Sequence, residues 1–143
     1  MARGVCRALA ARGLATLTEF SLRDGRRADV IALDSAGEIA IVEVKASLAD
    51  FRADGKWSAY LAFCDRFYFA VPRDFPRDVL PEDHGLLVAD PYHAELLRPA
   101  PLAKLSAARR RALILRFAQV ASQRLARSSD PGAGDGWQST ETF

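Results

Sequence analysis

The sequence predicts an α/β fold with a mixed central sheet, and two features carry this prediction. Residues 26–45 (RRADVIALDSAGEIAIVEVK) contain two apolar segments joined by a short loop, the pattern of a β-hairpin. A helical pattern then leads to a compact aromatic segment, residues 66–71 (RFYFAV). A strand, a helix and a strand in this order form a parallel pair with a right-handed crossover. The antiparallel hairpin and this parallel pair together make the predicted sheet mixed.

The composition is that of an ordinary globular protein, because 50% of its 143 residues are hydrophobic and 27% are charged. We expect one domain over residues 1–127, which is long enough to bury a core, and a disordered tail over residues 128–143, which has no hydrophobic periodicity. No apolar run approaches the ~20 residues that cross a bilayer, and arginines interrupt the first helical segment, so neither a membrane span nor a secretory signal is expected. Cys6 and Cys64 form neither a disulfide framework nor a metal-ligand pattern, and the expected location is the cytoplasm.

The first elements are a helix over residues 2–13, which ends at Gly13, and a strand over residues 14–22. Glu19 lies within this strand. It can project toward the following hairpin as an acidic catalytic residue, or it can be a solvent-facing strand glutamate. The sequence leaves both interpretations open.

The hairpin has a predictable register. Its three-residue loop ends in a glycine, as expected of a type I turn followed by a left-handed residue. Pairing of Asp34 with Glu38 then places Asp29 opposite Glu43. Because strand side chains alternate between faces, these two carboxylates share one face with Lys45. Both faces of the hairpin are otherwise apolar, which indicates a central strand pair.

Two directly opposed carboxylates on a buried face are unfavourable unless something offsets their charge. A hard divalent cation does so, because Mg²⁺ binds one or two carboxylates and leaves its other positions to water and phosphate oxygens. Lys45 adds a positive charge beside the place where a phosphate would lie. The combination of Asp29, Glu43 and Lys45 is therefore typical of a metal-dependent, phosphodiester-cleaving site.

An isolated aspartate followed by Glu43-Val44-Lys45 resembles the PD-(D/E)xK nuclease superfamily, with Ala28 in place of the proline of that name. The longer string from Leu14 to Pro72 also resembles the MmcB-like DNA repair proteins, a bacterial branch of that superfamily. The resemblance implies a restriction-endonuclease-like core with the element order αβββαβ, a divalent metal (Mg²⁺ or Mn²⁺) held by Asp29 and Glu43, and DNA as the partner. In this superfamily an additional acidic residue upstream often joins the site, and Glu19 is the best candidate here.

A helix is expected over residues 48–64, after the hairpin. Ser47 and Asp50 have the spacing of an N-cap and its partner, so a structural role for Asp50 is preferred to a catalytic one. Gly55 weakens the middle of this helix, which is therefore expected to split there, with Asp54 capping the second part.

The residues after this split have two interpretations. Lys56, Trp57 and Tyr60 can lie at the edge of the site, with Lys56 contacting DNA, or the two aromatic residues can pack on the sheet. Further along, residues 84–90 and 94–98 are predicted to add a hairpin at the edge of the sheet. His84 and His93 lack other ligands at metal-binding spacing and are expected to be loop residues.

The last predicted element is a helix from Ser106 to about Ala126. Residues 104–127 contain seven lysines and arginines and no acid, so the helix can contact phosphates through Arg109, Arg111 and Arg116, or it can be an ordinary solvated basic face. Its predicted buried stripe consists of Leu113, Ile114, Phe117, Val120, Ala121 and Leu125.

The leading functional hypothesis is a metal-dependent DNA nuclease that acts in repair. No zinc finger or helix-turn-helix is visible, so any preference should concern DNA structure rather than base sequence. The first alternative is a non-catalytic DNA- or partner-binding module on the same fold. A small-molecule enzyme is the last, because the sequence contains no phosphate-binding glycine loop or catalytic triad pattern. Whether the protein acts as a monomer or a homodimer is left open.

Overall fold

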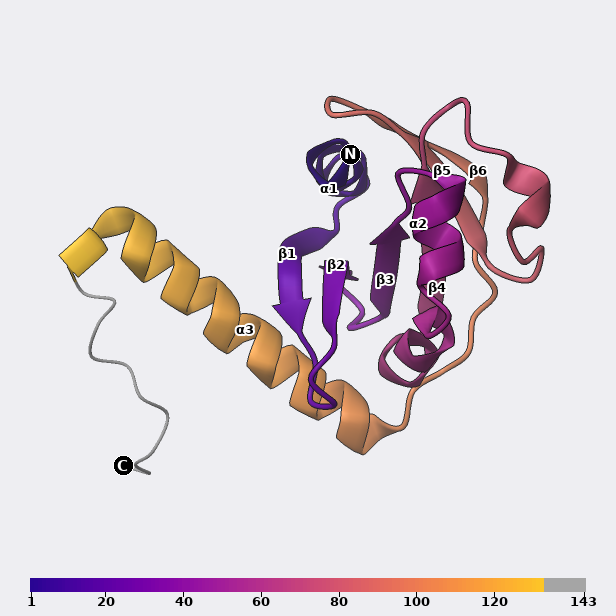
Figure 1. The fold of residues 1–143 in the computed structure, drawn as a ribbon. Helices are drawn as coiled ribbons and strands as arrows, with labels where there is room; N and C mark the ends of the chain where they lie inside the picture. The colour runs from indigo at the N-terminus through magenta and orange to yellow at the C-terminus, as the bar shows by residue number, and fades with distance from the viewer. Residues whose placement is uncertain (133–143) are drawn as a thin grey trace.

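The structure is a computed structural model that describes residues 1–132. A mixed sheet of six strands, arranged in the order of the sequence, forms its centre (Figure 1). The first three strands are antiparallel neighbours, the fourth and fifth continue parallel to the third, and the sixth returns antiparallel. The strands are β1 (Ala15–Ser21), β2 (Arg27–Leu33), β3 (Ile39–Val44), β4 (Arg66–Val71), β5 (Gly85–Ala89) and β6 (Ala94–Arg98). The predicted fold class is therefore confirmed, including the edge hairpin β5–β6.

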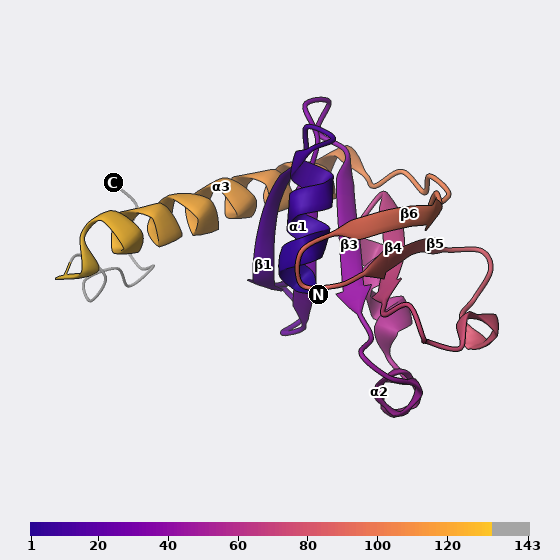
Figure 2. The ribbon, with the colours of Figure 1, turned by 90° about the horizontal axis from the view of Figure 1, so that it is seen from above.

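Helices cover both faces of the sheet. Helix α1 (Ala2–Ala10) packs on one face, where Val5 and Leu9 belong to one buried cluster with Val30 and Val42. Helix α3 (Ala107–Ser129) and the 3₁₀ helix η1 (Trp57–Phe63) pack on the other face. Figure 2 shows α1 in front of the sheet and α3 behind it. The short helix α2 (Leu48–Ala53) precedes η1, and one 3₁₀ turn, η2 (Arg77–Val79), lies between β4 and β5.

The register of the β2–β3 hairpin is the predicted one. Ile31 pairs with Ile41 and Leu33 with Ile39, so the numbers of paired residues add up to 72 throughout. The N–H of Asp34 donates to the Glu38 carbonyl at 3.1 Å, and Gly37 closes the loop with a φ of 85°, a conformation that favours glycine. The paired residues end at Val30 and Val42, and Asp29 and Glu43 are the next residue on each strand, where the Asp29 N–H donates to the Glu43 side chain.

The predicted helix over residues 48–64 is split, as expected, but its second part is a 3₁₀ helix rather than an α-helix. Ser47 Oγ accepts a hydrogen bond from the Asp50 N–H at 3.1 Å, which confirms the predicted cap of α2. The chain turns at Gly55, where Asp54 Oδ1 accepts from the Lys56 N–H at 3.2 Å. This turn ends α2 and redirects the chain over the sheet.

Helix α3 begins after Ser106, as predicted, and continues to Ser129, so residues 128 and 129 are helical rather than disordered. Residues 133–143 of the predicted tail lie outside the described residues. Leu113 and Phe117 are buried, but Leu125 is 68% exposed, which corrects the predicted stripe. The physical reason is visible in Figures 1 and 2, where the distal half of α3 extends past the edge strand β1.

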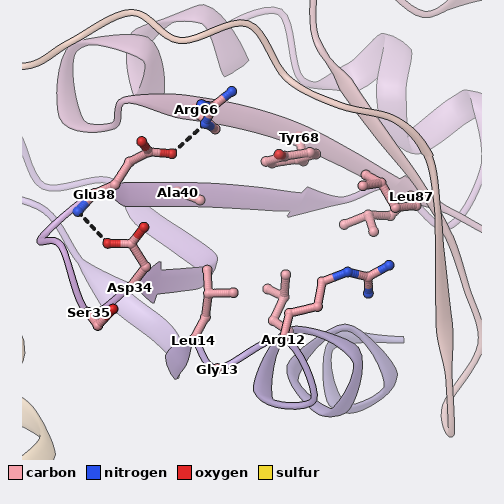
Figure 3. A pocket seen from close by; sticks show the side chains of 12 residues that line it. Arg12, Gly13, Leu14, Asp34, Ser35, Glu38, Ala40, Arg66, Tyr68 and Leu87 are labelled. Atoms are coloured by element: carbon pink, nitrogen blue, oxygen red, sulfur yellow. Dashed lines mark hydrogen bonds and ion pairs between the residues drawn. The ribbon is translucent and has the colours of Figure 1, made fainter.

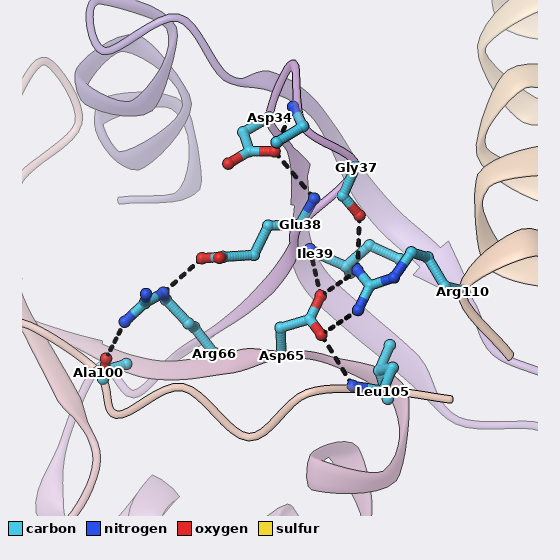
Figure 4. A network of polar contacts seen from close by, with 10 residues as sticks. Asp34, Gly37, Glu38, Ile39, Asp65, Arg66, Ala100, Leu105 and Arg110 are labelled. Atoms are coloured by element: carbon cyan, nitrogen blue, oxygen red, sulfur yellow. Dashed lines mark hydrogen bonds and ion pairs between the residues drawn. The ribbon is translucent and has the colours of Figure 1, made fainter. Parts of the chain in front are cut away.

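A buried ion pair attaches α3 to the sheet (Figure 4). The two Nη atoms of Arg110 donate to the two carboxylate oxygens of Asp65, each at 2.6 Å, and Asp65 also accepts from the N–H groups of Ile39 and Leu105. Burial alone would raise the pKa of Asp65, but these hydrogen bonds, above all those from Arg110, outweigh it and hold the pKa at about 2. The hairpin, the start of β4 and the start of α3 are thereby held together.

Candidate active site

Asp29 and Glu43 lie side by side on the sheet face that η1 and α3 cover. Asp29 is near the start of β2 and Glu43 near the end of β3. The N–H of Asp29 donates to Glu43 Oε1 at 3.2 Å, and the N–H of Val44 donates to Asp29 Oδ2 at 2.8 Å. Each carboxylate is therefore fixed by the backbone of the neighbouring strand. The structure brings together the two residues that the sequence predicts as metal ligands.

The two carboxyl groups disfavour each other's ionisation. Glu43 is only 3% exposed, and its burial, with the added charge of Asp29, raises its pKa to about 8. Burial likewise raises the pKa of Asp29. A pair of this kind either holds a proton at neutral pH or needs a nearby cation. Two adjacent, backbone-anchored carboxylates are donors that suit Mg²⁺, so the residues present fit the expected metal.

Lys45 is the third predicted catalytic residue, and the structure places its buried side chain beside the same pair. Its Nζ lies 4.0 Å from Glu43 Oε2 and 2.6 Å from Asp54 Oδ2. Burial would raise the pKa of Asp54, but the hydrogen bonds from Lys45 and from the Lys56 N–H lower it on balance. Lys45 is thus held by two carboxylates from different parts of the chain.

Asp54 is the site residue that sequence reasoning missed, since the sequence indicated only a capping role for it. The predicted cap is wrong, because η1 begins after Lys56 with no side-chain cap. Instead, Asp54 Oδ1 accepts from the Lys56 N–H, and its Oδ2 is the nearest acceptor to Lys45. The available signal was the Asp-Gly turn itself, because it brings a carboxylate back toward the end of β3.

Glu19 lies in β1 between Thr18 and Phe20, which pair with β2 on either side of Asp29. It has a φ of 51°, unusual for a residue with a side chain, and its carboxylate forms an ion pair with Arg27 at 2.6 Å. Its charge contributes to the raised pKa of Asp29. Within residues 1–132 no three His, Cys, Asp or Glu side chains gather in a way that could hold a metal. A ligand role for Glu19 stays a prediction.

The aromatic residues beyond Gly55 belong to the core. Trp57 stacks on Phe67, with ring centroids 5.6 Å apart, and contacts Phe69 edge-on at 5.1 Å. The Tyr60 hydroxyl donates to the Arg27 carbonyl at 3.0 Å, and its pKa is raised to about 12 by burial and by the nearby acidic groups. The packing interpretation is therefore confirmed for these rings. Lys56 is exposed at the turn beside Asp54.

Two of the predicted DNA-contacting arginines of α3 also hold the helix in place. Arg109 donates to the Ala62 carbonyl at 2.9 Å, and Arg116 donates to the Ser21 carbonyl at 2.8 Å. Both also line a surface hollow of about 900 Å³ beside Arg23, between α3 and the β1–β2 turn. Arg111 is exposed, and its side chain makes no hydrogen bond to any described residue. All three arginines remain accessible to an anion.

A second hollow, of about 410 Å³, is shown in Figure 3. It lies between the end of α1 and the β2–β3 loop, with the Glu38–Arg66 ion pair at one side. Ala40 and Leu87, which line it, belong to the sheet face that α1 covers. It is therefore on the opposite side of the sheet from Asp29 and Glu43.

Helices long and apolar enough to cross a bilayer are absent from residues 1–132. A family model described as DNA repair protein MmcB-like matches residues 1–132. The solved structure of a Silicibacter pomeroyi protein of unknown function is 47% identical in sequence, and it superposes with a TM-score of 0.90 over 98% of this chain and 94% of that one. No curated protein matches the chain significantly. The family match includes every described element, α3 among them.

Proposed function

Because this chain belongs to the MmcB-like DNA repair protein family, we propose that it is a metal-dependent DNA nuclease acting in repair. The observation that carries the proposal is the half-buried Asp29 beside the buried Glu43, with the ammonium of Lys45 only 4.0 Å from Glu43. A purely structural protein has no evident reason to place a second carboxylate beside a buried one, where the two repel each other. A phosphodiester-cleaving enzyme does have one, since it must hold a divalent cation next to a phosphate.

Asp29 and Glu43 would hold the cation, Mg²⁺ or Mn²⁺. When bound there, the metal supplies Lewis acidity, which activates water and offsets the charge that develops on the phosphate. The backbone hydrogen bonds to both carboxylates keep their oxygens in place before the metal arrives. Such preorganisation avoids the cost of rearranging the ligands during the reaction.

Lys45 would contact the phosphate or orient the attacking water, and its positive charge would stabilise the transition state. Its burial strengthens this effect, because charges interact more strongly where water is excluded. The Asp54 carboxylate at 2.6 Å keeps the ammonium near the site in the absence of DNA. Asp54 is thus proposed to position Lys45 without itself touching the substrate.

The arginines of α3 support DNA as the substrate. Arg109 and Arg116 line the hollow between α3 and the β1–β2 turn, and Lys56 is exposed at the turn beside Asp54. These side chains can neutralise phosphates, which gives affinity without base specificity. We therefore propose that recognition depends on DNA structure rather than on sequence.

The alternative is a repair factor that binds DNA or a partner on this fold without cleaving it. Two observations favour this alternative: the ion pair between Lys45 and Asp54, which occupies the lysine, and the lack, within residues 1–132, of a third side chain placed to share a metal with Asp29 and Glu43. It predicts DNA binding that is independent of divalent metal.

Cleavage of a labelled DNA panel separates the two functions. The panel contains single strand, duplex, flap, splayed fork and four-way junction, each incubated with Mg²⁺, Mn²⁺ or EDTA. The variants are Lys45→Met and Glu43→Gln, which keep side-chain volume, and the matched control is Glu95→Gln on the exposed side of β6. Fluorescence anisotropy on the same substrates measures binding.

The nuclease proposal expects metal-dependent cutting that falls by about 100-fold or more in both site variants and is unchanged in the control. Binding in every lane without cutting would establish the non-catalytic alternative. A protein that neither cuts nor binds any substrate of the panel would contradict both functions.

A further inference from the structure

The outward face of α3 is unusual because it is exposed yet almost free of charge. The face of α3 that packs on the sheet carries the buried Leu113 and Phe117. Leu115 lies opposite them and is 54% exposed, and Leu125, about 100° around the helix from them, is 68% exposed, although solvated helix faces ordinarily carry polar or charged residues. Figures 1 and 2 show that the distal half of α3 extends past β1, away from the sheet.

The residues of this face have the spacing of a helix that pairs with another helix. Their separations alternate between four and three, which averages the ~3.5 residues of a coiled-coil seam. We call this set the α3 stripe, and it consists of Arg111, Leu115, Ala118, Ser122, Leu125 and Ser129. With about 1.5 Å of rise per residue, the α3 stripe is ~27 Å long.

The α3 stripe is symmetric about residue 120, and this symmetry points to the partner. If two copies of α3 pack antiparallel about a two-fold axis at this level, Leu115 of one copy meets Leu125 of the other. Ala118 then meets Ser122, and both are small enough for close approach of the helices. An isologous contact requires this kind of self-complementarity, in which residue i meets residue j and j meets i.

The ends of the α3 stripe are also complementary in charge. The same register places Arg111 opposite Ser129 and next to Asp130 of the other copy. Arg111 makes no side-chain hydrogen bond within residues 1–132, and Asp130 is exposed at the end of the helix. We infer that the protein forms a homodimer through antiparallel pairing of α3 along the α3 stripe.

A second copy fits this face better than DNA does. Arg111 is the only base in the α3 stripe, whereas Arg109, Arg116 and Arg127 lie on another side of the helix. The dimer therefore leaves those arginines accessible. A single helix pair buries less than the ~1,200 Å² at the low end of standard interfaces, so we expect a dissociation constant in the micromolar range.

Sedimentation velocity of the full chain, in EDTA and without DNA, tests the dimer from about 1 to 500 μM. The variants are Leu115→Glu, Leu125→Lys and the double variant. Each single variant places a charge against a leucine of the partner, and dimerisation should weaken by about 10-fold or more. The double variant places Glu opposite Lys at both ends of the pair, and dimerisation should return.

The matched control is Leu102→Glu, which changes a leucine of similar exposure outside α3 and should leave association unchanged. Far-ultraviolet circular dichroism and thermal melting establish that every variant folds, as expected for exposed positions. A wild type that is monomeric at 500 μM would overturn the inference. So would single variants that associate normally, or a double variant in which association does not return. No outcome depends on nuclease activity, because neither DNA nor metal is present.

Discussion

Lys45 Nζ lies 2.6 Å from Oδ2 of Asp54, closer than it lies to any oxygen of Glu43. The two partners come from different elements, since Lys45 follows β3 and Asp54 follows α2. The pairing holds a buried ammonium at the edge of the carboxylate pair. Its removal is therefore a direct test of whether the position of Lys45 matters for catalysis.

We expect Asp54→Asn to lower kcat for DNA cleavage by about 10-fold or more, with a smaller change in KM, because Lys45 loses its anchor but keeps its charge. The buried ammonium also loses an ionic partner, so the free energy of unfolding should fall by about 1–3 kcal/mol. Steady-state kinetics at saturating Mg²⁺ and urea denaturation measure the two effects. Asp83→Asn, in an exposed loop, is the matched control. An unchanged kcat would show that Asp54 does not position the lysine.

The raised pKa of Glu43 predicts how the stability of the metal-free protein depends on pH. In the folded protein this pKa is about 8, against an ordinary value of 4.5, so folding takes up a proton between these values. Wild-type stability in EDTA should therefore decline as the pH rises from about 4.5 to 8. Glu43→Gln cannot ionise, and it should be more stable than wild type at pH 8, by about 4 kcal/mol, and within about 1 kcal/mol of it near pH 5.

Urea denaturation at pH 5 and pH 8 measures this difference. Added Mg²⁺ should stabilise the wild type at pH 8, because the metal binds the folded state, and it should stabilise Glu43→Gln much less. Glu95→Gln is the control and should follow the wild type in both respects. Parallel pH profiles for wild type and Glu43→Gln would contradict the raised pKa.

The ion pair between Asp65 and Arg110 predicts an opposite dependence on pH. The pKa of Asp65 is about 2 in the folded protein, below its ordinary value of 3.8. Its contribution, about 2 kcal/mol, is complete above about pH 5 and is lost as the pH falls toward 2. Asp65→Asn should remove this acid-sensitive component and, by leaving Arg110 without its partner, cost about 3–4 kcal/mol at pH 7.

Urea denaturation between pH 3 and pH 7 measures both effects. The control is Glu38→Gln, since the Glu38–Arg66 ion pair is partly exposed and should contribute less than about 1 kcal/mol. If Asp65→Asn and Glu38→Gln lowered the free energy of unfolding equally, burial of the Asp65–Arg110 ion pair would be unimportant.

Gly4 lets α1 approach the turn between β5 and β6. A Cβ atom at this position would lie 2.1 Å from the Asp90 carbonyl oxygen, so Gly4→Ala must displace the backbone and should cost about 1–3 kcal/mol or more. Gly55 is the matched control, because a Cβ atom there meets nothing within 4 Å. Gly55→Ala should stabilise the protein by about 0.4–1 kcal/mol. Thermal melts compare the two, and a neutral Gly4→Ala would contradict the close packing of α1.

The pairing of Asp29 with Glu43 was predictable because two local signals agree. The side chains of both hairpin strands alternate between faces, and the loop is closed by a glycine, so only one register keeps the apolar side chains of both strands buried. A slip of one residue would turn every side chain to the other face. The caps at Ser47 and Ser106 were predictable for a similar reason, since they depend on neighbours only three residues away.

The contacts that sequence reasoning missed all depend on how separate elements pack. Asp54 reaches Lys45 only because the turn at Gly55 brings the chain back over the end of β3. Arg110 belongs to a run of three arginines, and nothing local distinguishes it from Arg109 or Arg111, yet it alone reaches the buried Asp65. The same limit explains why Leu125 was wrongly expected to be buried. Periodicity predicts which residues share a helix face, but it does not predict whether another element packs against that face.

The sequence by itself determined the order of the elements, the register of the central hairpin and the face shared by Asp29, Glu43 and Lys45. These follow from periodicity and from backbone preferences that act over a few residues. Only the tertiary structure decided which carboxylate holds Lys45, which arginine anchors α3 and how far α3 extends past β1. Those outcomes depend on the directions in which separate elements pack, and packing is settled by the burial of whole surfaces rather than by local sequence.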